Sequence, residues 1–388
     1  MKTLKKVLLS KYFVIPVIGF LLGFLWVAFV HLGYFHQILE SLQTLPWYAH
    51  ILLGVLAIFI VILVHELGHL ILLVIMGFKI KAIYVLMLVL VKNKKWQFKF
   101  FWRFTKMLGG VVIPIIDNIT DDTSLMDAKK RLAKGVSAGP LASLIYCVIL
   151  NILLITAILV NIPAMVAWMF VLTVVTIFMT VLVFAASFAS MPGLYGDFIL
   201  KDKLKNDDIF GIYYLSLEKT DNDAQNYYFW TKMVPILENN GFMESSETKG
   251  ILLNYLQRLV FEKYIGCAAI NKRLDQLNFI QGNKEEILVL NYHLMYYYVD
   301  TDQLSKAKII FDKLKQAQYN VKPEVSLYWQ KVTDHYFNLS DETIFLSDIK
   351  NYYPQSISWI FSPIDVDHDI PAPINNEKWY NKINNNEE

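Results

Sequence analysis

Apolar residues gather in long runs in the first half of the chain, and polar positions become frequent only after about residue 200. Runs long enough to cross a bilayer as helices lie at 12–32 and 47–78. The stretch 135–196 has no charged residue and is long enough for two more spans, the second at about 164–189. This pattern predicts an α-helical multi-pass membrane protein with about four spans, followed by a C-terminal all-α soluble domain.

Between the second and third predicted spans, the period changes from helix to strand. A β-prone run at 83–91 is followed by a polar turn at 92–95, and aromatic residues then alternate with other residues from Trp96 to Phe104. We expect a β-hairpin at the membrane face. Its open edge, with Trp96 and Phe98, could pair with an extended peptide, or its aromatic side chains could anchor it in the interface. The next apolar segment, 108–116, is too short to span, so it is expected to re-enter partway or to pack on the helices.

Basic residues indicate the orientation. They are concentrated in 1–11 and 79–134, which the positive-inside rule places in the cytoplasm. Both termini are then cytoplasmic, and the protein lies in the cell membrane. The lysines before 12–32 also fit a cleaved signal peptide, but the run is long and no small-x-small cleavage site follows, so we expect a retained span.

Composition narrows the options further. Hydrophobic residues make up 55% of the chain, and the mean hydropathy is +0.39, which is high for a soluble protein. The net charge of +2 gives no reason to expect a nucleic-acid surface. Cys147 and Cys267 lie far apart, so neither a disulfide framework nor a cysteine-rich metal site is expected.

From Lys201 onward, the chain is charged, aromatic and patterned as helices. Segments 285–299 and 303–316 form a plausible helical hairpin, and a second pair could follow at 324–338 and 341–351. Ala307, Phe311 and Pro323 faintly resemble a tetratricopeptide repeat. Such a domain would bind a cytoplasmic protein or peptide partner; a plain helical bundle without a ligand is the alternative.

The second span contains His65-Glu66-Leu67-Gly68-His69. Imidazoles at i and i+4 lie on one helix face and can share a zinc ion, and Glu66 is placed to act as a general base toward water at the metal. Counted from Trp47, His65 lies about 27 Å along the helix, in the cytoplasmic third of the bilayer. A buried polar cluster without a metal is the alternative.

The fourth span ends in a segment rich in Pro and Gly that carries Asp197. A catalytic zinc needs a third protein ligand, and Asp197 is the best one available. Straight helical counting places it slightly beyond the membrane face, so the turn must fold back for the carboxylate to meet the histidines. The alternative is an ordinary interfacial Asp.

The third span carries a stripe of small and polar residues at every fourth position. Its members are Gly139, Ser143, Cys147 and Asn151. Such a stripe permits close helix packing, or it supports the metal site from the neighbouring helix.

Taken together, the membrane half resembles the site-2 protease family of intramembrane zinc metalloproteases. The resemblance rests on three elements in order: HELGH at 65–69, SAGPLAS at 137–143 and MPGLYGD at 191–197. It implies that His65, His69 and Asp197 bind zinc, that Glu66 is the general base, and that the hairpin belongs to a substrate-guiding sheet. Gly139, Pro140, Ser143 and Asn151 would then bind substrate or support the site.

Two positions depart from the family pattern. The family usually has Asn where this chain has Ser143, and Asp-Gly where it has Asp197-Phe198. The first departure weakens a role of position 143 in orienting the substrate. The second weakens the assignment of Asp197 as a metal ligand more than that of the histidines. No PDZ-like insert fits between the last two spans, so substrate selection must use other parts.

The resemblance implies an intramembrane zinc endopeptidase that cleaves a membrane-associated protein or small peptide near the cytoplasmic face. The expected domains are an N-terminal anchor (1–45), a protease core (46–200), a cytoplasmic helical domain (201–370) and a flexible tail (371–388). The alternative is a catalytically silent membrane scaffold whose helical domain recruits partners. An architecture like that of prenyl-protein proteases needs a later Glu ligand, and no Glu occurs between 67 and 217.

Overall fold

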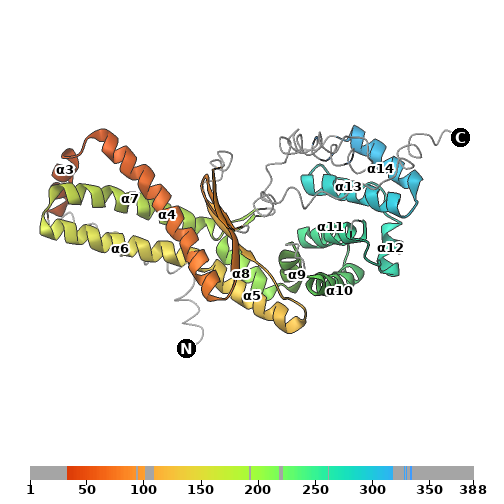
Figure 1. Cartoon of the computed structure of the whole chain (residues 1–388). Coiled ribbons are helices and arrows are strands. Elements are labelled where there is room, and N and C mark those ends of the chain that lie inside the picture. The colour runs from red at the N-terminus through yellow and green to blue at the C-terminus, as the bar shows by residue number, and fades with distance from the viewer. Residues whose placement is uncertain are drawn as a thin grey trace, which may run out of the picture.

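The computed structural model describes residues 33–92, 95–100, 109–191, 194–217, 222–260 and 262–317, together with 327, 329 and 333 (Figure 1). The predicted first span at 12–32, the second predicted helix pair of the soluble half and the tail lie outside this part, apart from those three single residues.

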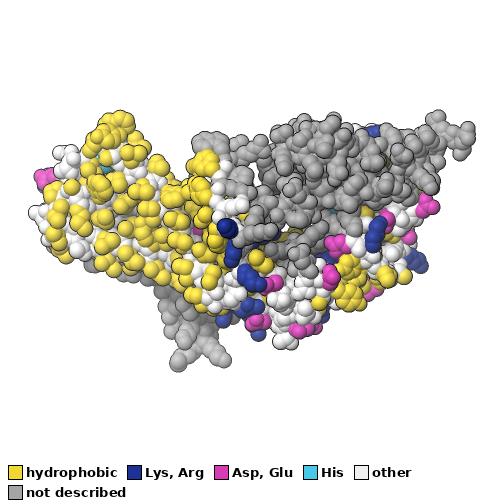
Figure 2. Space-filling view, viewed as in Figure 1, with side chains coloured by type: hydrophobic (Ala, Val, Ile, Leu, Met, Phe, Trp, Pro, Cys, Tyr) yellow, Lys and Arg dark blue, Asp and Glu magenta, His cyan; other side chains and the backbone are white. Residues whose placement is uncertain are grey.

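Three long apolar helices form one end of the molecule: α4 (Trp47–Ile75), α6 (Ala138–Val160) and α7 (Pro163–Ala186) (Figure 1). Each contacts the other two. By length and composition the described chain has three helical segments that could cross a membrane, the second of which joins α5 and α6. Their outer surface is apolar, as the yellow surface in Figure 2 shows. These helices match three of the four predicted spans.

The connection between α6 and α7 consists of residues that favour the end of one helix and the start of the next. α6 ends at Asn161 in the left-handed conformation, which Asn tolerates well, and Pro163 occupies the first turn of α7. The short helix α3 (Tyr34–Gln43) packs against this end, where the Gln37 amide donates to the Ile158 carbonyl (3.0 Å). The three helices are therefore joined tightly at the end remote from the motif on α4.

A four-stranded antiparallel sheet lies between the membrane helices and the soluble half (Figure 1). Its strands are β1 (Lys79–Val85), β2 (Leu88–Lys92), β3 (Trp96–Phe100) and β4 (Gly110–Ile115), in the order β3-β2-β1-β4. The predicted hairpin is confirmed as β2 paired with β3 across the polar turn.

One interpretation for this region needs correction in detail, and of the two alternatives for segment 108–116, packing on the helices is the one that its described part shows. The run 83–91 is not one strand, because the chain turns at Leu86 (φ 53°) and Met87 so that β1 pairs with β2. The apolar segment 108–116 does lie against α4, but its described part is the edge strand β4, paired with β1. The turn at Leu86 and Met87 lacks an Asn-Gly or Asp-Gly pair, and β4 lacks strict alternation of apolar and polar residues, so neither element carries its usual sequence signal.

The remaining helices of the described chain build a connecting layer and the soluble half. The connecting layer contains α5 (Asp122–Val136), α8 (Asp197–Asn206) and α9 (Asp208–Ser216). The soluble half contains α10 (Asp223–Asn239), α11 (Ser246–Val260), α12 (Ala268–Leu274), α13 (Glu285–Asp300) and α14 (Leu304–Gln316). The predicted helical hairpin is confirmed as α13 and α14, which pack together.

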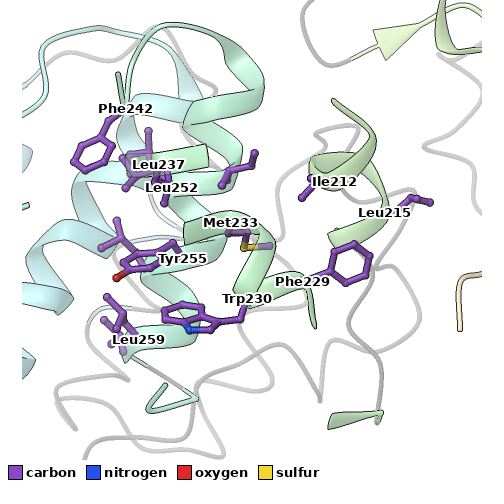
Figure 3. Close-up of a cluster of buried hydrophobic side chains, with 14 of the residues drawn as sticks. Ile212, Leu215, Phe229, Trp230, Met233, Leu237, Phe242, Leu252, Tyr255 and Leu259 are labelled. Atoms are coloured by element: carbon purple, nitrogen blue, oxygen red, sulfur yellow. The ribbon is translucent and has the colours of Figure 1, made fainter. Parts of the chain in front are cut away.

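The core of the soluble half includes the contact between α10 and α11, where the Trp230 ring stacks on Tyr255 with centroids 4.5 Å apart (Figure 3), and it extends to α13. This core is continuous with buried side chains of the membrane half and the connecting layer. A single cluster runs from Leu73 of α4 through Leu132 and Leu204 to α13. The membrane half and the soluble half are therefore packed as one body rather than joined by a free linker.

Candidate metal centre

The histidine motif lies in the second half of α4, with His65, Glu66 and His69 all buried. The two imidazole rings meet edge to face, and their Nε2 atoms are 3.2 Å apart. Helical spacing alone brings the two nitrogens together on one face, as the i, i+4 separation predicts.

Asp197 reaches these nitrogens because the chain folds back after α7. The short strands β5 (Ser190–Met191) and β6 (Leu194–Tyr195) pair as a hairpin, and the Phe198 N–H then donates to the Ser187 carbonyl (3.0 Å). Gly196 permits this approach, since a Cβ there would lie 2.2 Å from the Ala186 carbonyl oxygen. Asp197 thus begins α8 beside the end of α7, with its carboxylate 3.2 Å from the Ser187 hydroxyl.

The three side chains form a small triangle of ligand atoms. Asp197 Oδ2 is 3.3 Å from His65 Nε2, and Oδ1 is 3.5 Å from His69 Nε2. Bond lengths of about 2.0–2.1 Å in a tetrahedral zinc site place ligand atoms roughly 3.3 Å from one another. His65, His69 and Asp197 could therefore hold one metal ion without rearrangement.

Protonation also fits metal binding. His69 Nδ1 is 3.0 Å from the Gly135 carbonyl, which can only accept, so the proton of the neutral ring lies on Nδ1 and Nε2 keeps its lone pair. His65 Nδ1 is 3.2 Å from Ser143 Oγ. When no metal is bound and the rings carry a proton on Nε2, burial acts to raise the pKa of Asp197, but the bonds and charge attraction from His65 and His69 together hold it below its usual value.

Glu66 lies beside this triangle and is 3% exposed. Its Oε2 atom has no hydrogen-bond partner within the described part of the chain. An unpaired buried carboxylate oxygen lowers the stability of the folded protein unless a further group, such as a reacting water, forms a hydrogen bond with it. Gly110, at the start of β4, closes on the same side chain: a Cβ there would lie 2.5 Å from Glu66 Cγ.

The stripe on α6 reaches the metal centre only at its first two positions. Gly139 faces both imidazoles, since a Cβ there would lie 2.2 Å from His69 Nε2 and 2.7 Å from His65 Nε2. Pro140 is buried next to it, and Ser143 contacts His65. Asn151 lies two turns farther along and donates to the Cys147 carbonyl of its own helix (2.8 Å), so the structure does not bring it to the site.

The structure also separates the aromatic strand from the motif. Trp96 and Phe98 lie exposed on β3, whereas β4, which begins beside Glu66, is at the opposite edge of the sheet. Three strand spacings, about 14 Å, lie between these edges. Sequence patterns did not single out Gly110, the Gly135 carbonyl or Ser187. Of these, only Gly110 offered a signal, as a glycine within the apolar segment 108–116.

Comparison with known proteins identifies the family of this chain. The model of peptidase family M50 matches residues 53–336, well over half of the chain. The chain belongs to peptidase family M50. This is the site-2 protease family, so the predicted resemblance is confirmed, and the M50 match indicates a membrane metalloprotease. Searches of curated proteins and of solved structures found no match. The likeness of the C-terminal helices to tetratricopeptide repeats stays a prediction.

Proposed function

We propose that this M50 protein is a zinc endopeptidase that cleaves a membrane-associated protein or small peptide near the cytoplasmic face. The observation that carries the proposal is the triangle of His65, His69 and Asp197 beside the unpaired oxygen of Glu66. The basic residues of the sheet and of α5, such as Lys79 and Arg131, lie at the same end as the motif and support the cytoplasmic side.

In this proposal, His65, His69 and Asp197 would hold the zinc ion, which would supply Lewis acidity for activating water and polarising the scissile carbonyl. Glu66 accepts the proton of the attacking water at its free Oε2 and delivers it to the leaving amide nitrogen. Ser143 and the Gly135 carbonyl keep the two imidazoles oriented through Nδ1.

The sheet supports a path for the substrate. Within the described strands, β4 pairs only with β1, so its other edge offers main-chain donors and acceptors next to Glu66. An extended segment added to that edge would bring its peptide bonds to the metal centre. A helical substrate must unwind first, because its peptide bonds are closed by internal hydrogen bonds. We therefore assign substrate pairing to β4 instead of to Trp96 and Phe98.

Metal analysis tests the ligand set. Purified wild-type protein is expected to carry about one zinc per chain, and His65→Ala and Asp197→Ala are expected to lose most of it because two ligands are too few for a stable site. His50→Ala is the matched control, since His50 is on the same helix about 22 Å away. Full zinc occupancy in Asp197→Ala would remove this residue from the ligand set.

A second prediction concerns the partner of His65. Ser143→Ala removes the hydroxyl at 3.2 Å from Nδ1, and we expect metal affinity to fall about 10–100-fold because the imidazole is no longer held in one orientation. Competition with a chelator of known affinity measures this. Thr156→Ala, which removes an exposed hydroxyl from the same helix, should leave the affinity unchanged. Equal affinities for both variants would show that Ser143 only packs.

A further inference from the structure

The soluble half touches the turn that carries Asp197. Glu247, on α11, points its Oε1 atom toward this turn and accepts hydrogen bonds from Lys203 Nζ (2.6 Å) and the Tyr195 hydroxyl (3.3 Å). Tyr195 precedes Asp197 by two residues, and Lys203 lies on the helix that Asp197 begins. One carboxylate of the soluble half is thus bonded to the chain on both sides of Asp197.

These groups form a compact, half-buried cluster. Lys203 Nζ lies 4.8 Å from the ring centres of both Tyr195 and Phe210, and the two rings meet edge to face at 5.2 Å. The Glu247 side chain is 11% exposed. Burial acts to raise the pKa of Glu247, but the bond and charge attraction from Lys203, together with the other hydrogen bonds to this carboxylate, lower it overall. Such a pair is screened less by salt than one at the surface.

The position of Asp197 depends on contacts of this kind. On the membrane side, it is held by two backbone hydrogen bonds, Gly196 N–H to Ala189 and Phe198 N–H to Ser187, and by the Ser187 hydroxyl. On the other side, α8 packs against α5 and α9, and Glu247 adds hydrogen bonds to Tyr195 and Lys203. Because a metal site tolerates only small displacements of a ligand atom, a change on either side should be felt in metal affinity.

The soluble half is attached to the site at a second point. Gln225 of α10 is fully buried; its Nε2 donates to the Ile116 carbonyl (2.9 Å), and its Oε1 accepts from the Ile119 N–H (3.0 Å). Ile116 directly follows β4, the strand that begins beside Glu66. The two attachments hold the soluble half against both the ligand turn and the substrate edge.

We propose that Glu247 is a positioning residue through which the helical domain fixes the Asp197 turn, so that metal affinity depends on the docking of that domain. This inference rests on the proposed metalloprotease function. It makes the helical domain a regulator of the site: a cytoplasmic partner that pulls α11 away from α8 would weaken the metal centre, and one that holds α11 in place would strengthen it.

The experiment is a cobalt titration of the full chain in detergent, read by the visible absorption of the bound ion and by chelator competition. Glu247→Ala is expected to weaken Co²⁺ binding about tenfold, within the range typical of coupling between sites, and to shift the absorption bands because the Asp197 carboxylate is displaced. The charge-swapped pair Glu247→Lys with Lys203→Glu is expected to recover part of the affinity, because the ion pair returns while the contact of a cation with the two rings is lost.

The matched control is Glu286→Ala. Glu286 forms a similar ion pair with Lys249 (3.1 Å) between α11 and α13, within the helical domain and away from the turn. The Glu286→Ala variant should lower thermal stability less than Glu247→Ala, because Glu286 is more exposed, and should leave Co²⁺ affinity unchanged. Tyr195→Phe, which removes only one hydroxyl, covers the case in which Glu247→Ala does not fold, and should weaken binding about two- to threefold.

The outcomes separate the two proposals. A wild-type protein that binds no cobalt would overturn the metalloprotease function itself. If the wild type binds while Glu247→Ala and Tyr195→Phe bind equally well, the metal site stands and the positioning role is wrong. Equal losses in Glu247→Ala and Glu286→Ala would also overturn it, because the effect would then be general destabilisation.

Discussion

Replacing Glu66 by Gln is expected to lower the rate of substrate cleavage by about 10²–10⁴-fold while leaving zinc content unchanged. Gln has nearly the same shape, but its amide cannot accept the proton of the attacking water. Glu66 is buried beside the metal centre, and its Oε2 atom has no hydrogen-bond partner in the described chain, so this oxygen is the expected proton acceptor. New N-termini of membrane proteins, compared between cells that produce the wild type and the variant, measure the effect.

The control for this prediction is Glu40→Gln, the same substitution at an exposed position of α3, at the other end of the membrane helices. It should leave processing at the wild-type level. If processing persists in Glu66→Gln, proteolysis by this site is not the function, and the scaffold hypothesis, in which the helical domain recruits partners, becomes the better one.

The second large effect is expected for Gly139→Ala. The added methyl carbon would lie 2.2 Å from His69 Nε2 and 2.7 Å from His65 Nε2, well inside van der Waals contact with both metal-facing nitrogens. His65 and His69 both belong to α4, which packs tightly on α6. Neither ring can therefore move away from the added methyl group unless the two helices separate. We expect loss of zinc and of cleavage together, measured by metal analysis and the same N-terminal comparison.

Gly54→Ala provides the matched control for the Gly139 variant. It adds the same methyl group to α4, but at a place where the nearest atom, Val175 Cγ2, lies at an ordinary 3.9 Å. Its zinc content should equal that of the wild type. A Gly139→Ala protein with one zinc per chain would mean that the metal-facing side of the imidazoles is not where the structure places it.

Local spacing predicted the parts of the site that lie within one element. His65, Glu66 and His69 share a helix, so their relation follows from 3.6 residues per turn. Asp197 could be singled out because it is the first acid after an uncharged stretch, yet its contact with the histidines depends on the return of the chain to Ser187. That return is a pairing between backbones, which no side-chain pattern encodes.

In the sheet, too, local patterns identify single elements, whereas their arrangement depends on pairing between distant segments. Alternation of aromatic residues identified β3, but sheet order decides which edge lies beside Glu66, and this order depends on pairing between segments distant in the chain. The stripe on α6 was likewise recognised as one face, but only the depth of the motif on α4 determines that Ser143 reaches the site and Asn151 does not.

The hydrophobic cluster shared by the two halves has a consequence for biosynthesis. The ribosome releases the membrane helices first and needs roughly ten seconds more to make the chain from α9 to α14. Until those helices pack on α8, the Asp197 turn lacks the support of Glu247. A nascent copy would therefore hold its metal ion more weakly than the finished protein until its helical domain has folded.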